Sequence, residues 1–249
     1  MLNDRNAVLA RNYTFVRQTV RRQFNSAGGE ESRHSEEHEI TILFSQPHSR
    51  LIARDGRPLL PKEEKKEQDK LAKTFAQRKN ETEAEKQKRL ADDEQRRERA
   101  RAFLREVPEA YDFRLLGEEA LQGRYAWIIE AAPRPGYRPR DPRARILPKV
   151  RGRLWIDKAE SQWVKADLEA IDTLSFAGFL FRLGKGSRLE FEQVKINDEV
   201  WLPKRLYANI SARLALIKKF QGDVELTYSN YRKFRSDAEI VLTDPPHGI

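Results

Sequence analysis

The chain has 249 residues, of which 39% are hydrophobic and 35% charged, and its mean hydropathy of −0.80 is polar for a globular protein. The formal net charge of +9 favours anionic partners such as nucleic acid, lipid headgroups or lipopolysaccharide phosphate. The absence of cysteine excludes disulfides, thiolate metal sites and a cysteine nucleophile within this sequence. No stretch approaches the roughly 20 apolar residues that a membrane helix needs.

Strands joined by short turns are predicted at the start of the chain. Residues 12–25 contain the β-rich run Tyr13-Thr14-Phe15-Val16, and Ser26-Ala27-Gly28-Gly29 follows as a turn. In residues 38–44, Ile40 and Ile42 alternate with polar neighbours, which is the pattern of a strand with one buried face. Residues 51–53 then lead into Asp55-Gly56, a tight-turn signal.

The segment 61–107 is dense in charged residues and predicts two helices. Pro61 suits a first helical position, and Thr82 with Glu85 has the spacing of a capping box. We expect the helices to meet near Asn80 and the second to end at Pro108. We interpret residues 61–107 as a charged two-helix insertion into a single domain that spans residues 1–249.

Short strands resume at Phe113, separated by turn signals at Gln122-Gly123, 158–161, Asn197-Asp198 and Gly222-Asp223. Residues 133–148 are rich in proline and arginine and predict a loop with one short helical turn. In total the sequence predicts about eight to eleven antiparallel strands, interrupted once by helices. This indicates a mainly β fold of the α+β class: a curved antiparallel sheet forming a half-open, incomplete barrel, with helices covering the concave side.

No catalytic constellation stands out, and we expect neither enzyme activity nor a metal or other cofactor. His34 and His38 have helical spacing, but they fall in a polar turn that enters a strand, where this spacing does not converge on a metal. The serines lack a nucleophile-elbow context, and no glycine-rich phosphate loop opens a helix.

Tryptophans on several strands indicate an apolar binding space. Trp127, Trp155, Trp163 and Trp201 all fall on predicted strands. A sheet of this kind needs either a thick helix layer against it or an apolar ligand. We predict that these four residues line the ligand space, with plain core packing as the alternative for each of them.

The glycine-punctuated apolar stretch 175–186 has two interpretations. Phe176, Phe179 and Phe181 either lie on a flap that closes the apolar cavity or belong to a short buried helix. On a flap, Arg182 and Lys185 would sit at the mouth of the cavity and meet an anionic headgroup.

The arginines of the loop 133–148 are the most concentrated positive feature. Arg138, Arg140 and Arg143 are predicted to contact anionic headgroups, with nucleic-acid contact and simple solvent exposure as alternatives. In the predicted helices acids and bases are interleaved, which argues against tracking of nucleic-acid phosphates there.

Four short motifs follow one another in the β-rich half of the chain: Gly152-Arg153-Leu154-Trp155-Ile156-Asp157-Lys158 with Trp163-Val164, Glu192-Gln193, Val200-Trp201-Leu202-Pro203 and Tyr228-Ser229-Asn230-Tyr231-Arg232-Lys233-Phe234. In this order they resemble the outer-membrane lipoprotein-sorting superfamily, the LolA/LolB-like carriers, and in particular their relatives in soil bacteria. The resemblance covers most of the chain outside the charged helices. It implies a half-open barrel closed by helices, a periplasmic location and an apolar cavity for acyl chains. The segment 61–107 departs from it, being longer and more charged than such carriers need.

Three functions are therefore compared. We expect a periplasmic binding or carrier protein for a lipid or lipoprotein acyl chain, with transient contact to a membrane surface and with a signal peptide removed before Met1. The alternative implied by the resemblance is an envelope interaction or stress-sensor protein that binds a partner protein. The least favoured is a nucleic-acid-binding protein that uses the basic residues of the segment 134–153.

Overall fold

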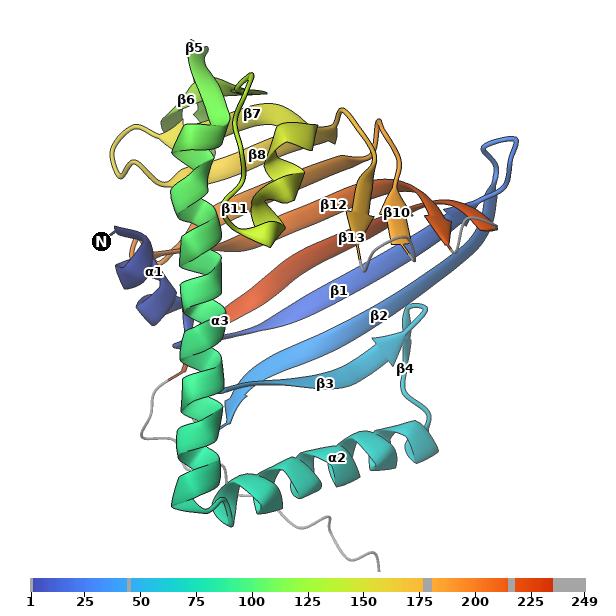
Figure 1. Cartoon of the computed structure of the whole chain (residues 1–249). Helices are drawn as coiled ribbons and strands as arrows, with labels where there is room; N and C mark the ends of the chain where they lie inside the picture. The colour runs from blue at the N-terminus through green and yellow to red at the C-terminus, as the bar shows by residue number, and fades with distance from the viewer. Residues whose placement is uncertain (1, 44–45, 177–180, 215–217, 235–249) are drawn as a thin grey trace, which may run out of the picture.

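The computed structural model describes residues 2–43, 46–176, 181–214 and 218–234 (Figure 1). Its helices are α1 (Leu2–Ala10), α2 (Pro61–Lys79), α3 (Glu83–Ala110) and the 3-10 helix η1 (Pro142–Lys149). Its strands are β1 (Tyr13–Phe24), β2 (Glu30–Leu43), β3 (Gln46–Arg54), β4 (Arg57–Pro58), β5 (Tyr111–Leu121), β6 (Arg124–Pro133), β7 (Val150–Asp157), β8 (Trp163–Ala170), β9 (Leu174–Phe176), β10 (Phe181–Leu183), β11 (Arg188–Ile196), β12 (Val200–Leu214) and β13 (Lys218–Lys233).

These strands form one antiparallel sheet. The order across it is β4-β3-β2-β1-β13-β12-β11-β8-β7-β6-β5, and the β9–β10 hairpin attaches to β12 beside this path. β1 pairs with β13, so the first and last strands lie side by side near the middle. Within the described residues the outermost strands β4 and β5 do not pair with each other, and the curved sheet is not closed into a barrel (Figure 1).

The register shows that the two faces of the sheet differ, because cross-strand partners point to the same face. One row of partners on seven strands is apolar: Leu115, Ile129, Leu154, Ala166, Phe191, Leu206 and Leu226. The residues next to them in the chain form a polar row on the opposite face: Arg114, Glu130, Arg153, Asp167, Glu190, Tyr207 and Glu225. We call the first the apolar row.

Ion pairs join neighbouring strands on the polar face. Arg205 lies 2.8 Å from Glu190 and 2.7 Å from Glu225, so that it bridges β11, β12 and β13. Arg22 on β1 lies 3.4 Å from Glu225 and 3.1 Å from Asp223. A charged face of this kind is the usual solvent side of an antiparallel sheet.

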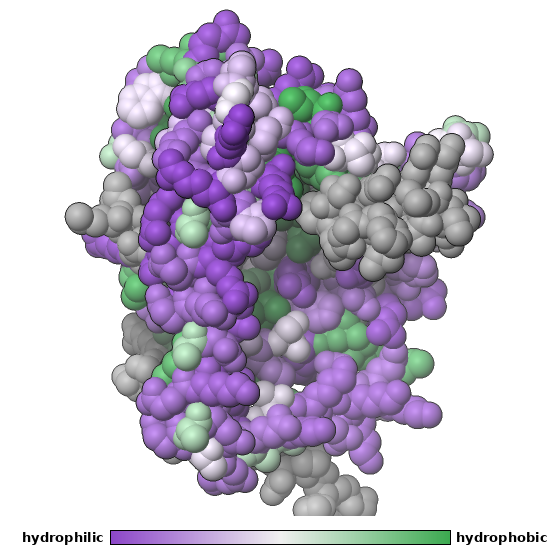
Figure 2. Space-filling model, viewed as in Figure 1, coloured by the Kyte–Doolittle hydropathy of each residue, from purple (hydrophilic) through white to green (hydrophobic). Residues whose placement is uncertain are grey.

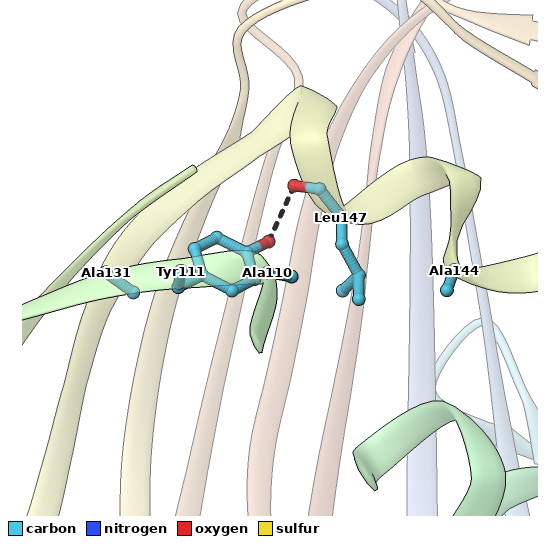
Figure 3. Close-up of a cluster of buried hydrophobic side chains, with 5 residues drawn as sticks. All are labelled: Ala110, Tyr111, Ala131, Ala144 and Leu147. Atoms are coloured by element: carbon cyan, nitrogen blue, oxygen red, sulfur yellow. Dashed lines mark hydrogen bonds between the residues drawn. The ribbon is translucent and has the colours of Figure 1, made fainter. Parts of the chain in front are cut away.

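The apolar face carries the helices. Ala110 and Tyr111, where α3 runs into β5, form a buried cluster with Ala131 of β6 and with Ala144 and Leu147 of η1 (Figure 3). The Tyr111 hydroxyl donates a 2.9 Å hydrogen bond to the carbonyl oxygen of Leu147. These contacts hold η1 and the end of α3 against the sheet.

The remainder of α3 is solvated and charged. Its ion pairs lie largely along the helix itself, as between Arg101 and Glu94 at 3.0 Å and between Arg105 and Glu98 at 2.9 Å. The residues that α3 buries are Asp93, Glu106 and Ala110, so no long apolar stripe faces the sheet. The helix therefore crosses the apolar face without sealing it.

The structure confirms the predicted fold class, an open, curved antiparallel sheet with helices on one face. The two charged helices are confirmed as α2 and α3, with the Thr82–Glu85 capping box in place. The predicted turns at Gln122-Gly123 and Asn197-Asp198 are confirmed as well, with positive φ at all four residues.

Two predictions about elements were wrong, and one element was not predicted. Gly222 and Asp223 are not a turn, because β13 runs through them and Arg22 pairs with the buried Asp223. α3 continues past Pro108 to Ala110, where packing in the cluster with η1 offsets the hydrogen bond that proline lacks. α1 was not predicted, because tertiary hydrogen bonds hold it: the Asn6 amide bonds both the N–H and the carbonyl oxygen of Trp201, at 2.7 and 2.9 Å.

Candidate functional site

A cavity of about 430 Å³ lies between the apolar face at β1–β3 and the helix α3. Its lining consists of Ala10, Arg11, Tyr13, Phe15, Ile40, Ile42, Gln46, Pro47, Asp93, Arg96 and Arg97. The strand residues supply an apolar floor and α3 supplies a polar wall. A volume of this size lies within the range of about 300 to 1,000 Å³ that is typical of small-molecule sites.

The floor of the cavity is continuous with the rest of the apolar face. Phe15 pairs with Ile40 across β1 and β2. Its ring centre lies 5.8 Å from that of Tyr228 and 5.4 Å from that of Tyr231. Tyr228 is two residues from Leu226 on β13, so the aromatic floor leads directly into the apolar row.

Asp93 closes the polar wall of the cavity. It accepts a 2.9 Å hydrogen bond from the Gln46 amide and forms an ion pair with Arg96. Burial by itself would raise the pKa of Asp93, but the hydrogen bonds from Arg96 and Gln46 outweigh it and hold the pKa below its ordinary value. Asp93 is therefore ionised and satisfied near neutral pH, and it ties α3 to the sheet.

Much of the apolar face is only partly covered. Leu115 is 62% exposed and Phe113, two residues before it on the same face, is 45% exposed. Ile129, Leu154, Phe191, Leu206 and Leu226 are half-buried. Figure 2 shows apolar side chains deep in the hollow beside α3, within a largely hydrophilic surface. Contiguous exposed apolar surface on a soluble protein commonly marks a binding site.

A second, smaller pocket of about 100 Å³ has Arg124, Asp157, Lys165 and Trp201 in its lining. Trp155 and Trp201 share a buried cluster with Ala126 and Val164. Their indole N–H groups donate to carboxylates, Trp155 to Glu119 at 2.6 Å and Trp201 to Glu160 at 2.7 Å. The indole N–H groups of these two tryptophans are thus satisfied, as is usual for tryptophans packed in a buried cluster.

The other two predicted tryptophans lie apart from this cluster. The Trp163 ring centre is 4.8 Å from that of Phe191, a member of the apolar row, and Trp163 is 37% exposed. Trp127 is half-buried, with the Lys158 ammonium 5.8 Å from its ring centre. None of the four tryptophans lines the larger cavity. Their role in ligand binding stays a prediction.

The predicted flap cannot be placed. Phe179 lies outside the described residues, and so do the side chains of Phe176, Phe181 and Arg182, whose backbones belong to β9 and β10. Lys185 is exposed in the turn between β10 and β11.

Most of the predicted basic loop is paired with acids. Arg140 lies 2.7 Å from Glu109, and Arg143 forms an ion pair with Asp141, whereas Arg138 is exposed. Further ion pairs in the segment 134–153 join Arg134 to Asp112, Lys149 to Asp172 and Arg151 to Glu169. This pairing leaves less free positive charge for nucleic-acid phosphates. Headgroup contact by Arg138, Arg140 and Arg143 stays a prediction.

Sequence reasoning missed most of the cavity floor. Phe15 and Tyr228 were part of predicted strands and motifs but were not assigned to the site. The alternation of apolar and polar residues along β12 and β13 is the signal that could have identified their face. Within the described ranges no group of three or more His, Asp or Glu side chains is placed to hold a metal ion. Among the helices described, none has the length and apolar character needed to span a membrane.

No protein-family model matches the chain, and no curated protein matches it either. Solved structures resemble it at low identity. An outer membrane lipoprotein-sorting protein domain from Vibrio parahaemolyticus is 11% identical, with 96% of this chain and 94% of that chain covered and a TM-score of 0.31. A LolA superfamily protein from Nitrosomonas europaea is 11% identical, with 93% of each chain covered and a TM-score of 0.29. The MucA/MucB complex from Pseudomonas aeruginosa is 12% identical, with 94% and 98% covered and a TM-score of 0.22. At such identities and TM-scores no superfamily, ligand or partner carries over to this chain.

Proposed function

We propose that this protein is a periplasmic binding or carrier protein that holds the apolar chain of a lipid or lipoprotein along the helix-bearing face of its sheet, without catalytic chemistry of its own. The observation that carries the proposal is the apolar row, which stays partly uncovered and leads through Phe15 and Tyr228 into a cavity of about 430 Å³.

The physical basis is the apolar surface that an extended acyl chain would remove from water. Burial of apolar surface contributes roughly 25 cal/mol per Å², so a chain that crosses several half-buried residues gains several kcal/mol. Over β11, β12 and β13 the opposite face is charged and ion-paired and offers no comparable gain. The cavity under α3 supplies a concave end to this surface.

The experiment is a titration of the full chain with a long-chain fatty acid, a lysophospholipid and a synthetic lipopeptide, each below its micelle concentration. Tryptophan fluorescence is the readout, since the Trp163 ring contacts that of Phe191 in the apolar row. We expect a saturable change with at least one of the three. No response to any of them would contradict the proposal.

Two neighbouring residues of β12 supply matched variants. Leu206 belongs to the apolar row, whereas Tyr207 points to the polar face. Leu206→Gln should raise the amphiphile Kd about 5-fold or more, because roughly 1 kcal/mol of apolar contact is lost. Tyr207→Gln should leave the Kd unchanged. Equal effects of the two substitutions would argue against this face as the site.

The segment 175–186 remains part of this proposal as a closing flap. Phe179→Ala should weaken amphiphile binding while leaving the melting temperature nearly unchanged, because the lost contacts form chiefly in the bound state. If Phe179 is a core residue, the same substitution should instead cost about 3 to 5 kcal/mol of stability.

A second candidate function, binding of a partner protein in the envelope, is favoured by the edge strand β5. This strand has a neighbour on one side only among the described residues, and it exposes Phe113, Leu115 and Leu116. An open edge with exposed apolar side chains can accept a further strand from a partner. Leu116→Lys, a change outside the apolar row, should then abolish the partner's binding while leaving the amphiphile titration unchanged.

A further inference from the structure

Arg17 lies at the centre of the helix-bearing face, beside the cavity. Its register partners are His38 on β2 and Tyr228 on β13, and Phe15 precedes it by two residues on the same face. Because each strand residue advances the chain by about 3.4 Å, Arg17 lies about 7 Å along β1 from the cavity floor. Arg17 thus lies between His38 and Tyr228, with the aromatic Phe15 on one side along β1 and Thr19 on the other.

Arg17 has no anionic partner within the part of the chain that the structure describes. Its Nε atom and the Nδ1 atom of His38 are the only buried side-chain nitrogen or oxygen atoms without a hydrogen-bond partner among the described residues. The side chain of Arg17 forms no ion pair with any described residue. Its neighbour Arg22, in contrast, pairs with Asp223 and Glu225 on the polar face.

The two acids that act on the pKa of His38, Glu36 and Glu67, are paired with other residues. Glu36 lies 3.5 Å from Arg21 and 3.6 Å from Arg54. Glu67, which extends from α2 toward β3, pairs with Lys70 and accepts a 3.2 Å hydrogen bond from the N–H of Leu51. Neither of these acids forms an ion pair with Arg17.

His38 shares this environment. Burial lowers the pKa of His38 and the charge of Arg17 lowers it further, whereas Glu36 and Glu67 act in the opposite direction. The imidazole is therefore neutral at pH 7 and adds a hydrogen-bonding group beside the guanidinium without adding charge.

Arg17 is half-buried, but its Nε atom is buried without a hydrogen-bond partner, and buried polar atoms are nearly always satisfied. The planar guanidinium fork matches the oxygens of a carboxylate or a phosphate. We infer that Arg17, with His38 beside it, is the anchor for the anionic headgroup of the ligand, a carboxylate or phosphate monoester, whose chain extends over Phe15, Tyr228 and the apolar row. The inference rests on the proposed function and narrows its ligand class to anionic amphiphiles.

Three ligands with the same chain but different headgroups test the inference: palmitate, hexadecyl phosphate and hexadecanol. Their Kd values for the full chain are measured by displacement of a fluorescent fatty-acid probe. We expect palmitate, hexadecyl phosphate or both to bind at least about 10-fold more tightly than hexadecanol, which corresponds to about 1.4 kcal/mol. Whichever of the two anions binds with the lower Kd identifies the preferred headgroup as carboxylate or phosphate.

Removal of the charge at residue 17 is the decisive step. Arg17→Met should reduce the affinity for the anions to that for hexadecanol and leave hexadecanol binding unchanged. Its melting temperature should not fall, because the lost side chain has no partner in the free protein. Arg17→Lys, which keeps the charge but not the fork, should retain part of the preference.

Arg22→Met is the matched control on the same strand. It removes a cation that is paired on the opposite face, so it should lower the melting temperature and keep the preference for anions. Equal affinities of the wild-type chain for the three ligands, or an unchanged preference in Arg17→Met, would overturn the inference and leave the proposed function intact. Absence of binding of all three ligands would overturn both.

Discussion

Arg124 and Asp157 form a two-hydrogen-bond ion pair across β6 and β7, with Nε 2.8 Å from Oδ2 and Nη2 3.0 Å from Oδ1. The Asp157 side chain is 2% exposed. Its Oδ1 atom also accepts hydrogen bonds from the backbone N–H groups of Ala159 and Glu160, at 3.1 and 2.8 Å. One carboxylate therefore holds both a neighbouring strand and the turn between β7 and β8.

Substitution of Asp157 by Ala should strongly destabilise the protein. It leaves two backbone N–H groups without their acceptor and Arg124 with only the weaker contact to Glu160, at 3.3 Å. Breaking a buried ion pair in this way costs about 3 to 5 kcal/mol. Chemical denaturation gives the free energy of unfolding. Glu169→Gln on β8 is the control. It removes a surface ion pair with Arg151 of β7 and should cost less than about 1 kcal/mol. A similar cost for the two variants would contradict the structural role of Asp157.

Stability should fall at acidic pH because two buried aspartates are paired in the folded chain. Burial alone would raise the pKa of Asp157, but hydrogen bonds from Arg124 and the following turn lower it, and the pKa of Asp93 is likewise lowered. The folded pKa values thus lie below the unfolded value of about 3.9. Their contribution is complete above about pH 5 and is lost as the pH falls through the folded pKa values.

Urea midpoints measured across this acidic range test the effect. The wild-type midpoint should decrease steadily on acidification, and Asp157→Asn should show a smaller decrease from a lower starting point. A wild-type midpoint that does not change between about pH 5 and about pH 3 would show that these carboxylates do not stabilise the fold.

Tyr111 should ionise only at strongly alkaline pH. Burial raises its pKa to about 12. Its hydroxyl donates to the carbonyl oxygen of Leu147 inside the cluster that joins α3, β5 and η1 (Figure 3). Tyr111→Phe should cost about 1 to 2 kcal/mol, because the buried carbonyl loses its donor. In an ultraviolet titration the variant should show one fewer phenol that ionises at strongly alkaline pH. If the number of such phenols were the same in the variant and the wild type, Tyr111 would be in solvent.

Gly152 should not tolerate a side chain. A Cβ atom there would lie 2.3 Å from the carbonyl oxygen of Asp167 and 2.6 Å from a methyl carbon of Leu168. Gly152→Ala should therefore cost about 1 to 3 kcal/mol or more through overpacking on β7 and β8. Gly29→Ala is the control, since its Cβ would meet only the Asn25 side chain, at 3.1 Å. Equal melting temperatures for the two variants would contradict the close approach at Gly152.

The local sequence determined the elements whose causes are local. Thr82 and Glu85 begin α3 through hydrogen bonds within one turn of helix, so four residues suffice to predict that start. Asn197 and Asp198 both adopt positive φ, near 50°, which these side chains tolerate better than most, and the hairpin between β11 and β12 follows from them. The alternation of apolar and polar residues likewise predicted an amphipathic antiparallel sheet.

Tertiary structure alone decided the features that depend on residues far apart in the sequence. Gly222-Asp223 reads as a turn, yet Arg22, 201 residues away, pairs with Asp223 and keeps both residues in a strand. α1 forms where the Asn6 amide reaches the backbone of Trp201. The candidate site likewise depends on residues that are far apart in the sequence. Nothing local marks Arg17 as different from Arg21 or Arg22. The register of β1 with β2 and β13 places Arg17 and Arg21 on the apolar face and Arg22 on the polar face, because successive side chains of a strand point to opposite sides. Tertiary contacts then pair Arg21 with Glu36, whereas Arg17 has no ion pair among the described residues.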